Sequence, residues 1–175
     1  MEEQATYNRK LKYDVVIGID PDVEHSGLAI LGQYDMKLTV NSHPFPELLE
    51  IVRSVAFEGA ELGHATVVYL SPKDTRASAA KKGEHVGRNQ ETGRKIVETL
   101  LHYGIKVIEQ SPLRKCWQGK YGKITHEELK WLCQMSGIEF NRPRSNQEER
   151  DAALLAITCS GLPIKYKVVE SNFNK

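Results

Sequence analysis

The sequence has few cysteines and no long apolar run, and both absences narrow the classes of protein to which it can belong. Its 175 residues include three cysteines, Cys116, Cys133 and Cys159, and no CxxC pair, which argues against a zinc site and a disulfide framework. No apolar run approaches the ~20 residues that cross a bilayer. The first dozen residues are polar, unlike a secretory signal. We therefore expect a cytoplasmic protein that contacts no membrane.

The charge of the chain is +1 overall but is divided unevenly along its length. Residues 1–71 contain 5 Lys and Arg against 11 Asp and Glu, whereas residues 72–123 contain 12 against 5. Residues 124–175 are balanced, with 7 of each sign. A basic segment beside an acidic one is typical of proteins that bind a polyanion next to an acidic site. A solvated basic surface without a partner gives the same pattern, so charge alone does not decide.

The hydrophobic pattern predicts one α/β domain over residues 1–175, with frayed ends at 1–12 and 169–175. We expect strands at residues 14–20, 27–31, 37–40, 66–70 and 105–108, and helices at 44–57, 84–103, 125–135 and 147–159. Thr125 and Glu128 have the spacing of a capping box at a helix start, and Gly104 stands at a helix end. Three consecutive strands followed by alternating strands and helices favour a mixed five-stranded sheet, antiparallel first and then parallel, with helices on both faces.

Asp20 is the first candidate for chemistry. It ends the apolar run DVVIGID and is followed by Pro21 and Asp22. A carboxylate at the end of a buried strand stands on a rigid base where the chain leaves the sheet. The same Asp-Pro pair is also a common turn starter, so the motif alone leaves both interpretations open.

Glu148 and Asp151 are the second candidate. Residues three apart on a helix share a face, and these two precede the small and apolar run AALLAI, which is suited to packing against a sheet. Acidic residues in the first turn also gain from the helix dipole. An ordinary acidic first turn would have the same appearance.

Together the two segments resemble the RuvC-like Holliday-junction resolvases of the RNase H-like superfamily, over about residues 14–158. In that family the first strand carries a GIDPG-type motif with a metal-binding aspartate, which Asp20 matches, and the last helix carries two aspartates three apart, which Glu148 and Asp151 match. Asp22 replaces the usual glycine, and we expect it to tolerate a left-handed turn. The family also has a glutamate after the middle strand, where this chain has Ser71.

The resemblance implies a crossover-junction type, Mg²⁺-dependent endodeoxyribonuclease. Two Mg²⁺ ions, with Mn²⁺ as a substitute, would be held by Asp20, Glu148 and Asp151, since hard cations prefer carboxylate oxygens. Ser71 leaves the fourth ligand position without a charge, and Asp74 or Glu84 could replace it. Cutting a symmetric junction needs two sites, so a homodimer is expected; the apolar stripe of the helix at 84–103 could form its interface, or could face the core.

The basic middle segment is predicted to contact DNA, because cations follow the phosphate backbone and aromatic rings stack on unpaired bases. The candidate contacts are Lys73, Arg76, Lys81, Lys82, Arg88, Asn89, Arg94, Arg114, Lys115, Trp117, Lys120 and Lys123. Trp117 could equally anchor its loop on the core.

We expect a metal-dependent endonuclease acting on branched DNA. Three alternatives stay open: a non-catalytic nucleic-acid-binding relative, suggested by Ser71; an RNA-processing nuclease of the YqgF-like branch; and a sugar-kinase-like phosphotransferase, which would need two such domains.

Overall fold

The computed structural model describes residues 12–72, 83–110, 113 and 115–166, with the backbone alone for 83–86. The expectation of frayed ends therefore lies almost wholly outside the described residues. So do five of the predicted DNA contacts, namely Lys73, Arg76, Lys81, Lys82 and Arg114, and the possible ligand Asp74.

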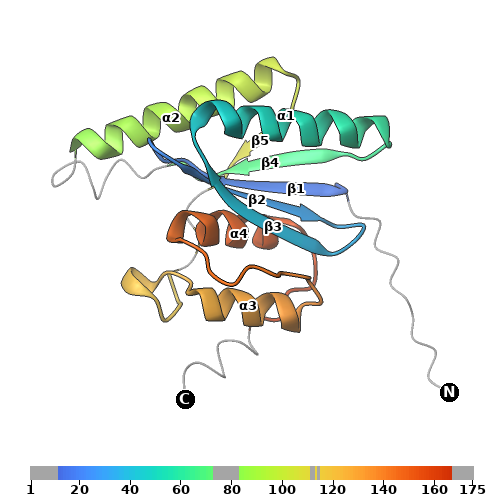
Figure 1. The fold of residues 1–175 in the computed structure, drawn as a ribbon, viewed down its shortest axis with the longest axis vertical. Helices are drawn as coiled ribbons and strands as arrows, with labels where there is room; N and C mark the ends of the chain where they lie inside the picture. Colours follow the sequence, from blue (N-terminus) through green and yellow to red (C-terminus); the bar gives the residue numbers. More distant parts are fainter. Residues whose placement is uncertain (1–11, 73–82, 111–112, 114, 167–175) are drawn as a thin grey trace.

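A five-stranded mixed sheet forms the centre of the molecule (Figure 1). Its strands are β1 (Val15–Asp20), β2 (Ser26–Gly32), β3 (Lys37–His43), β4 (Thr66–Leu70) and β5 (Val107–Glu109). Their order is β3-β2-β1-β4-β5. β1, β2 and β3 form an antiparallel meander, and β4 and β5 run parallel to β1. This is the RNase H-like arrangement that the sequence predicts.

In the described part of the chain, four α-helices cover the two faces of this sheet (Figure 1). α1 (Phe45–Glu61) and α2 (Gly83–His102) lie on one face; α4 (Gln147–Cys159) lies on the other, with α3 (His126–Met135) outside it. A short 3-10 turn, η1 (Lys120–Gly122), precedes α3.

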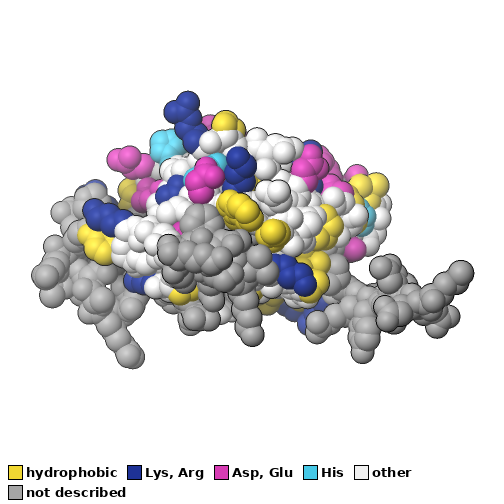
Figure 2. Space-filling model, turned by 90° about the horizontal axis from the view of Figure 1, so that it is seen from below, with side chains coloured by type: hydrophobic (Ala, Val, Ile, Leu, Met, Phe, Trp, Pro, Cys, Tyr) yellow, Lys and Arg dark blue, Asp and Glu magenta, His cyan; other side chains and the backbone are white. Residues whose placement is uncertain are grey.

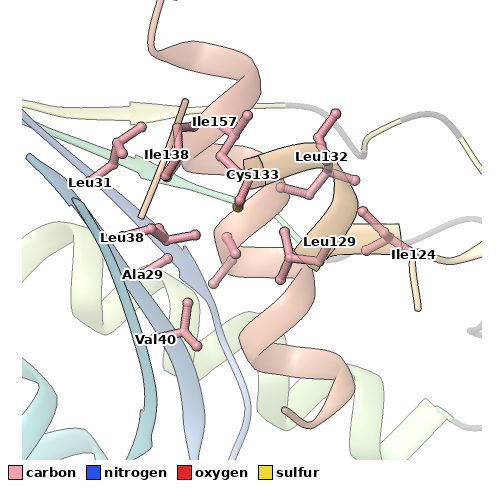
Figure 3. Packing of buried hydrophobic residues seen from close by; sticks show 14 of the residues in the cluster. Ala29, Leu31, Leu38, Val40, Ile124, Leu129, Leu132, Cys133, Ile138 and Ile157 are labelled. Carbon is pink, nitrogen blue, oxygen red and sulfur yellow. The ribbon is translucent and has the colours of Figure 1, made fainter. Parts of the chain in front are cut away.

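The two-residue alternation of β1 divides the core into two parts. Val15, Ile17 and Ile19 pack with α1 and α2, whereas Val16 packs with residues of α3 and α4. Figure 3 shows this second cluster, in which side chains of β2 and β3 meet those of α3 and α4. Even-numbered residues of β1 therefore face α4, and this fixes the side of the sheet to which Asp20 belongs.

The ends of the helices follow local sequence signals. The Thr125 side chain and Glu128 form the predicted capping box of α3. α2 ends in a Schellman motif, because Gly104 N–H bonds to Leu101 O and Ile105 N–H bonds to Leu100 O. Ile105 is thereby part of the helix stop, which explains why β5 begins two residues later than predicted.

The apolar stripe of α2 faces the core. Ile96 and Leu100 are fully buried against the sheet, and of the stripe's residues Leu101 is the exposed one. The buried part of this stripe therefore belongs to the core, which is one of the two roles considered from the sequence. In the part of the chain that the structure describes, no helix combines the length and apolarity needed to cross a membrane.

Candidate active site

Asp20 lies at the carboxyl end of the central strand, on the face that α4 covers. Its side chain is buried, at 5% exposure. The turn after it is stabilised by Asp22, whose carboxylate accepts hydrogen bonds from the N–H groups of Glu24 (2.9 Å) and His25 (3.2 Å). Asp22 is not among the described residues with positive φ. The turn therefore forms with aspartate at this position, and its side chain supports it without a left-handed backbone.

Three acidic residues near the start of α4, Glu148, Glu149 and Asp151, have different surroundings. Asn146 and Glu149 form a capping box, and Glu149, at 4% exposure, also accepts hydrogen bonds from Ser42 Oγ (3.1 Å) and Arg142 Nη2 (3.0 Å). Glu149 is thus held toward β3 as a structural group. Glu148 and Asp151 are both partly exposed, and they remain as the pair that the sequence identifies.

Two glycines bring α4 against the strands beside Asp20. Gly27 is the cross-strand partner of Asp20, and a Cβ added to it would lie 2.1 Å from Glu148 O. A Cβ on Gly18 would lie 2.1 Å from Ala152 O. The backbone of α4 therefore rests directly on β1 and β2, and Glu148 stands next to the strand pair that ends at Asp20.

Lys123 forms an ion pair with Asp151, one of the three candidate carboxylates. Its Nζ is 3.0 Å from Asp151 Oδ2, and Gln147 Nε2 donates to the other oxygen, Oδ1, at 2.8 Å. Partial burial lowers the pKa of Lys123, but the bond to Asp151 and the charges of Asp151, Asp20 and Glu148 together raise it above its ordinary value. The ammonium group thus neutralises Asp151 by direct contact, and the negative charges of Asp20 and Glu148 favour its protonated form.

The three carboxylates do not form a ready coordination sphere. Among the residues that the structure describes, no group of three or more His, Cys, Asp and Glu side chains is arranged to hold a metal ion. Their chemistry suits Mg²⁺ or Mn²⁺, since both are hard ions that bind carboxylate oxygens. A metal ion shared with Asp151 would have to replace Lys123 there.

Ser71 lies at the end of β4, next to the end of β1 that carries Asp20. Its N–H donates to Ile19 O at 3.0 Å, one residue beyond the Ile19–Leu70 pair. Val67 and Tyr69 pack on the α4 side of the sheet, so Ser71 continues the row on that side. Ser71 as the vacant ligand position stays a prediction.

Gln110 extends the same row and was not identified from the sequence. Its N–H donates to Leu70 O at 3.0 Å, and it follows Ile108, which packs on the α4 side. Asp20, Ser71 and Gln110 thus stand at the carboxyl ends of β1, β4 and β5. The available signal was the position of Gln110 just after an apolar strand.

The described part of the basic segment is less uniform than its charge indicates. Arg94 bonds to Glu91 (2.7 Å) and Glu98 (3.0 Å) along α2, and Asn89 Oδ1 accepts from Val23 N–H at 2.9 Å. Both side chains thus have partners within the protein. On the face drawn in Figure 2, the visible Lys and Arg side chains are dispersed among acidic and apolar ones.

Trp117 corrects the prediction that it contacts DNA. It is 8% exposed and belongs to the core cluster with residues of α3 and α4, so its ring is not available for stacking. Lys115 and Lys120, on either side of it, are exposed, as is Arg88 on α2.

Comparisons with known proteins give similarity in fold without similarity in sequence. No protein-family model and no curated protein matches the chain. Among solved structures, RuvC of T. thermophilus in complex with a Holliday junction substrate is similar with a TM-score of 0.49 and 16% identity, over 82% of this chain and 90% of that one. The fowlpox virus Holliday junction resolvase is similar with a TM-score of 0.48 and 12% identity, over 90% and 99%. The fold assignment itself rests on the strand order and pairing directions.

Proposed function

We propose that this protein is a metal-dependent DNA endonuclease of the RuvC-like resolvase type, hydrolysing phosphodiester bonds in branched DNA. The observation that supports the proposal is the packing of the first turns of α4, which carry Glu148 and Asp151, directly on β1 and β2 at the end of the sheet where Asp20 lies. Carboxylates at such a place can hold a divalent cation, and the adjoining Lys115 and Lys120 can contact the phosphate backbone.

In the proposed mechanism, Asp20, Glu148 and Asp151 would hold Mg²⁺. Bound Mg²⁺ supplies an activated water and neutralises charge on the scissile phosphate. Asp20 is fixed by the strand and orients the site from the sheet, while Gln147 fixes one oxygen of Asp151. Lys123, once separated from Asp151, can donate to a phosphate oxygen on which negative charge develops. Because a symmetric junction has two strands to cut, we propose that a homodimer acts on it.

The test is incubation with an end-labelled four-way junction, a matched duplex, a single strand and an RNA stem-loop, each with Mg²⁺, Mn²⁺ or EDTA. We expect metal-dependent cuts in the junction. Cuts in the RNA alone would indicate the RNA-processing branch instead.

A second candidate is a non-catalytic protein that binds branched nucleic acid. Two observations favour it: Ser71 stands where the family has a glutamate, and Lys123 already neutralises Asp151. Junction binding without cleavage in any metal would establish this candidate and exclude the endonuclease.

Substituting Ser71→Glu should raise the metal affinity. The new carboxylate would lie on the same side of the sheet as Asp20, and affinity for hard cations grows with the number of charged ligands. We expect Mn²⁺ to bind on the order of tenfold more tightly, and cleavage to increase most at low Mg²⁺. Isothermal titration with Mn²⁺ and cleavage across a Mg²⁺ series measure the two effects. Ser71→Gln, similar in size and without charge, is the control; equal gains in both variants would mean that charge at position 71 is irrelevant.

Lys123→Met should also raise the affinity of the DNA-free protein for Mn²⁺. The substitution keeps an unbranched side chain of similar reach and removes the ammonium that competes for Asp151. We expect on the order of tenfold tighter binding, because a charge-assisted bond no longer has to be broken. Lys120→Met on the same loop is the matched control and should leave titration unchanged. Weaker Mn²⁺ binding in Lys123→Met would contradict competition between lysine and metal.

A further inference from the structure

The loop from Trp117 to Lys123 is held rigidly beside the candidate active site. The Trp117 side chain anchors the loop in the core. The backbone N–H of Trp117 donates to Gly122 O at 2.9 Å, and the backbone N–H of Gly119 donates to Lys123 O, also at 2.9 Å. Glu128, at 2% exposure, accepts the N–H of Gln118 at 3.0 Å. Both ends of the loop are therefore tied to the same buried scaffold.

Close backbone contacts leave this loop little freedom. A Cβ on Gly119 would lie 2.3 Å from Lys123 O, and one on Gly122, whose φ is +74°, would lie 2.5 Å from Lys115 O. The chain can fold so tightly only because both residues are glycine.

Tyr121, at the tip of this loop, is an unusual residue for the turn that it occupies, which Lys123 N–H closes by donating to Lys120 O at 3.2 Å. Its φ is 59° and its ψ is 25°, a left-handed conformation that is unfavourable for an aromatic residue. Burial of the ring does not offset this cost, because Tyr121 is 74% exposed. The ring contact found for it is with the Lys120 ammonium, 5.1 Å from the ring centroid. Strain of this kind at an exposed side chain indicates a role in binding.

The loop brings Tyr121 close to the carboxylates. Lys123, two residues along the chain, reaches Asp151 with its Nζ at 3.0 Å. Two residues span no more than about 7 Å of backbone. Tyr121 therefore belongs to the same short loop as the lysine that contacts Asp151, within the length of one or two nucleotides of a strand bound there.

We propose that Tyr121 stacks on an unpaired nucleobase at the branch point of the DNA, while Lys120 contacts a neighbouring phosphate. The proposal rests on the proposed function and deepens it, since it assigns recognition of branched over fully paired DNA to one side chain. A rigid exposed ring next to a cation suits a nucleobase, whose π-face is apolar and whose backbone is anionic. The sequence indicated aromatic stacking in this segment, and the structure transfers the role from the buried Trp117 to Tyr121.

The first test compares junction and duplex binding by fluorescence anisotropy in Ca²⁺, for the full chain and its variants. Tyr121→Ala should weaken binding to a four-way junction about 5- to 100-fold, the loss expected for one base–aromatic stack, and change duplex binding less than about twofold, because paired bases have no free face. Tyr121→Phe should bind the junction as the unsubstituted protein does. Tyr34→Ala, at an exposed tyrosine that contacts His64, is the matched control and should change neither. In a junction labelled with 2-aminopurine at the branch, stacking of the Tyr121 ring should quench the fluorescence of the label. Of these three variants, Tyr121→Ala should be the one that loses this quenching.

The second test separates recognition from folding through Tyr121→Gly. Glycine adopts a φ of 59° without steric cost. The melting temperature of the Tyr121→Gly variant should therefore be equal to or higher than that of the unsubstituted protein, while its affinity for the junction falls as in Tyr121→Ala. Unchanged junction affinity in both variants would overturn the proposal and leave the proposed function intact. Equal losses of affinity for the junction and for the duplex would also overturn it, since the ring would then not distinguish branched from fully paired DNA. Failure of the unsubstituted protein to bind either DNA would overturn the proposed function and this proposal together.

Discussion

Asp20→Asn is expected to abolish cleavage of a four-way junction while leaving the protein folded. The substitution removes one negative charge and keeps the shape of the side chain at the end of β1, where Asp20 is buried. A carboxylate that holds a metal ion cannot be replaced by a neutral amide without losing most of the electrostatic stabilisation. We expect a fall in rate of at least about 10²–10³-fold, comparable with the loss of one preorganised polar group in other active sites. Initial cleavage rates at saturating Mg²⁺ measure it, with circular dichroism to follow the fold.

Asp22→Asn is the matched control for this prediction. It lies two residues away, and the amide oxygen of asparagine can still accept the N–H groups of Glu24 and His25 that the carboxylate accepts now. Its cleavage rate should stay within about threefold of that of the unsubstituted protein, since asparagine is a comparable turn former. Equal activity in Asp20→Asn and Asp22→Asn would exclude Asp20 from the reaction.

Gly18→Ala should destabilise the protein severely. The added methyl group would lie 2.1 Å from the carbonyl oxygen of Ala152, and a helix backbone cannot rotate away as a flexible side chain can. α4 would have to move off the sheet, which costs about 3 kcal/mol or more and corresponds to a fall in melting temperature of about 6–12 °C. Thermal denaturation followed by circular dichroism tests this.

Gly87→Ala provides the opposite control on an open site. Gly87 lies within α2, and an added Cβ meets nothing within 4 Å. Alanine is the better helix former by about 1 kcal/mol, so this variant should melt at a slightly higher temperature. A loss of stability of similar size in both variants would mean that the helix–strand contact at Gly18 does not limit the packing of α4.

The fold could be predicted because its main signals are local and periodic. The apolar runs of β1 and β4, the small and apolar run of α4 and the Thr125 capping box each depend on a few adjacent residues. Only part of β3 could be predicted because its last residues, Asn41, Ser42 and His43, are polar; β3 is an edge strand of the sheet, where burial selects apolar side chains less strongly.

The candidate site was only partly predictable because it depends on contacts between distant segments. Asp20 and the pair on α4 were identified from motifs, whereas the meeting of Lys123 with Asp151 joins residues 28 apart in the chain. The burial of Trp117 depends on the packing of α3 and α4. The left-handed backbone of Tyr121 has no sequence signal of the usual kind, because glycine and asparagine are the residues that normally indicate it.

The contacts between α4 and the sheet restrict the residue type on the strands but not on the helix. At Gly18 and Gly27 the obstacle to any side chain is a backbone carbonyl, that of Ala152 or Glu148, and every amino acid carries such a carbonyl. A saturation library selected for folding alone should therefore retain only glycine at positions 18 and 27, while position 148 drifts freely. Selection for activity would then restrict position 148 to acidic residues. The difference between the two selections would show that this position is restricted by the reaction and not by folding.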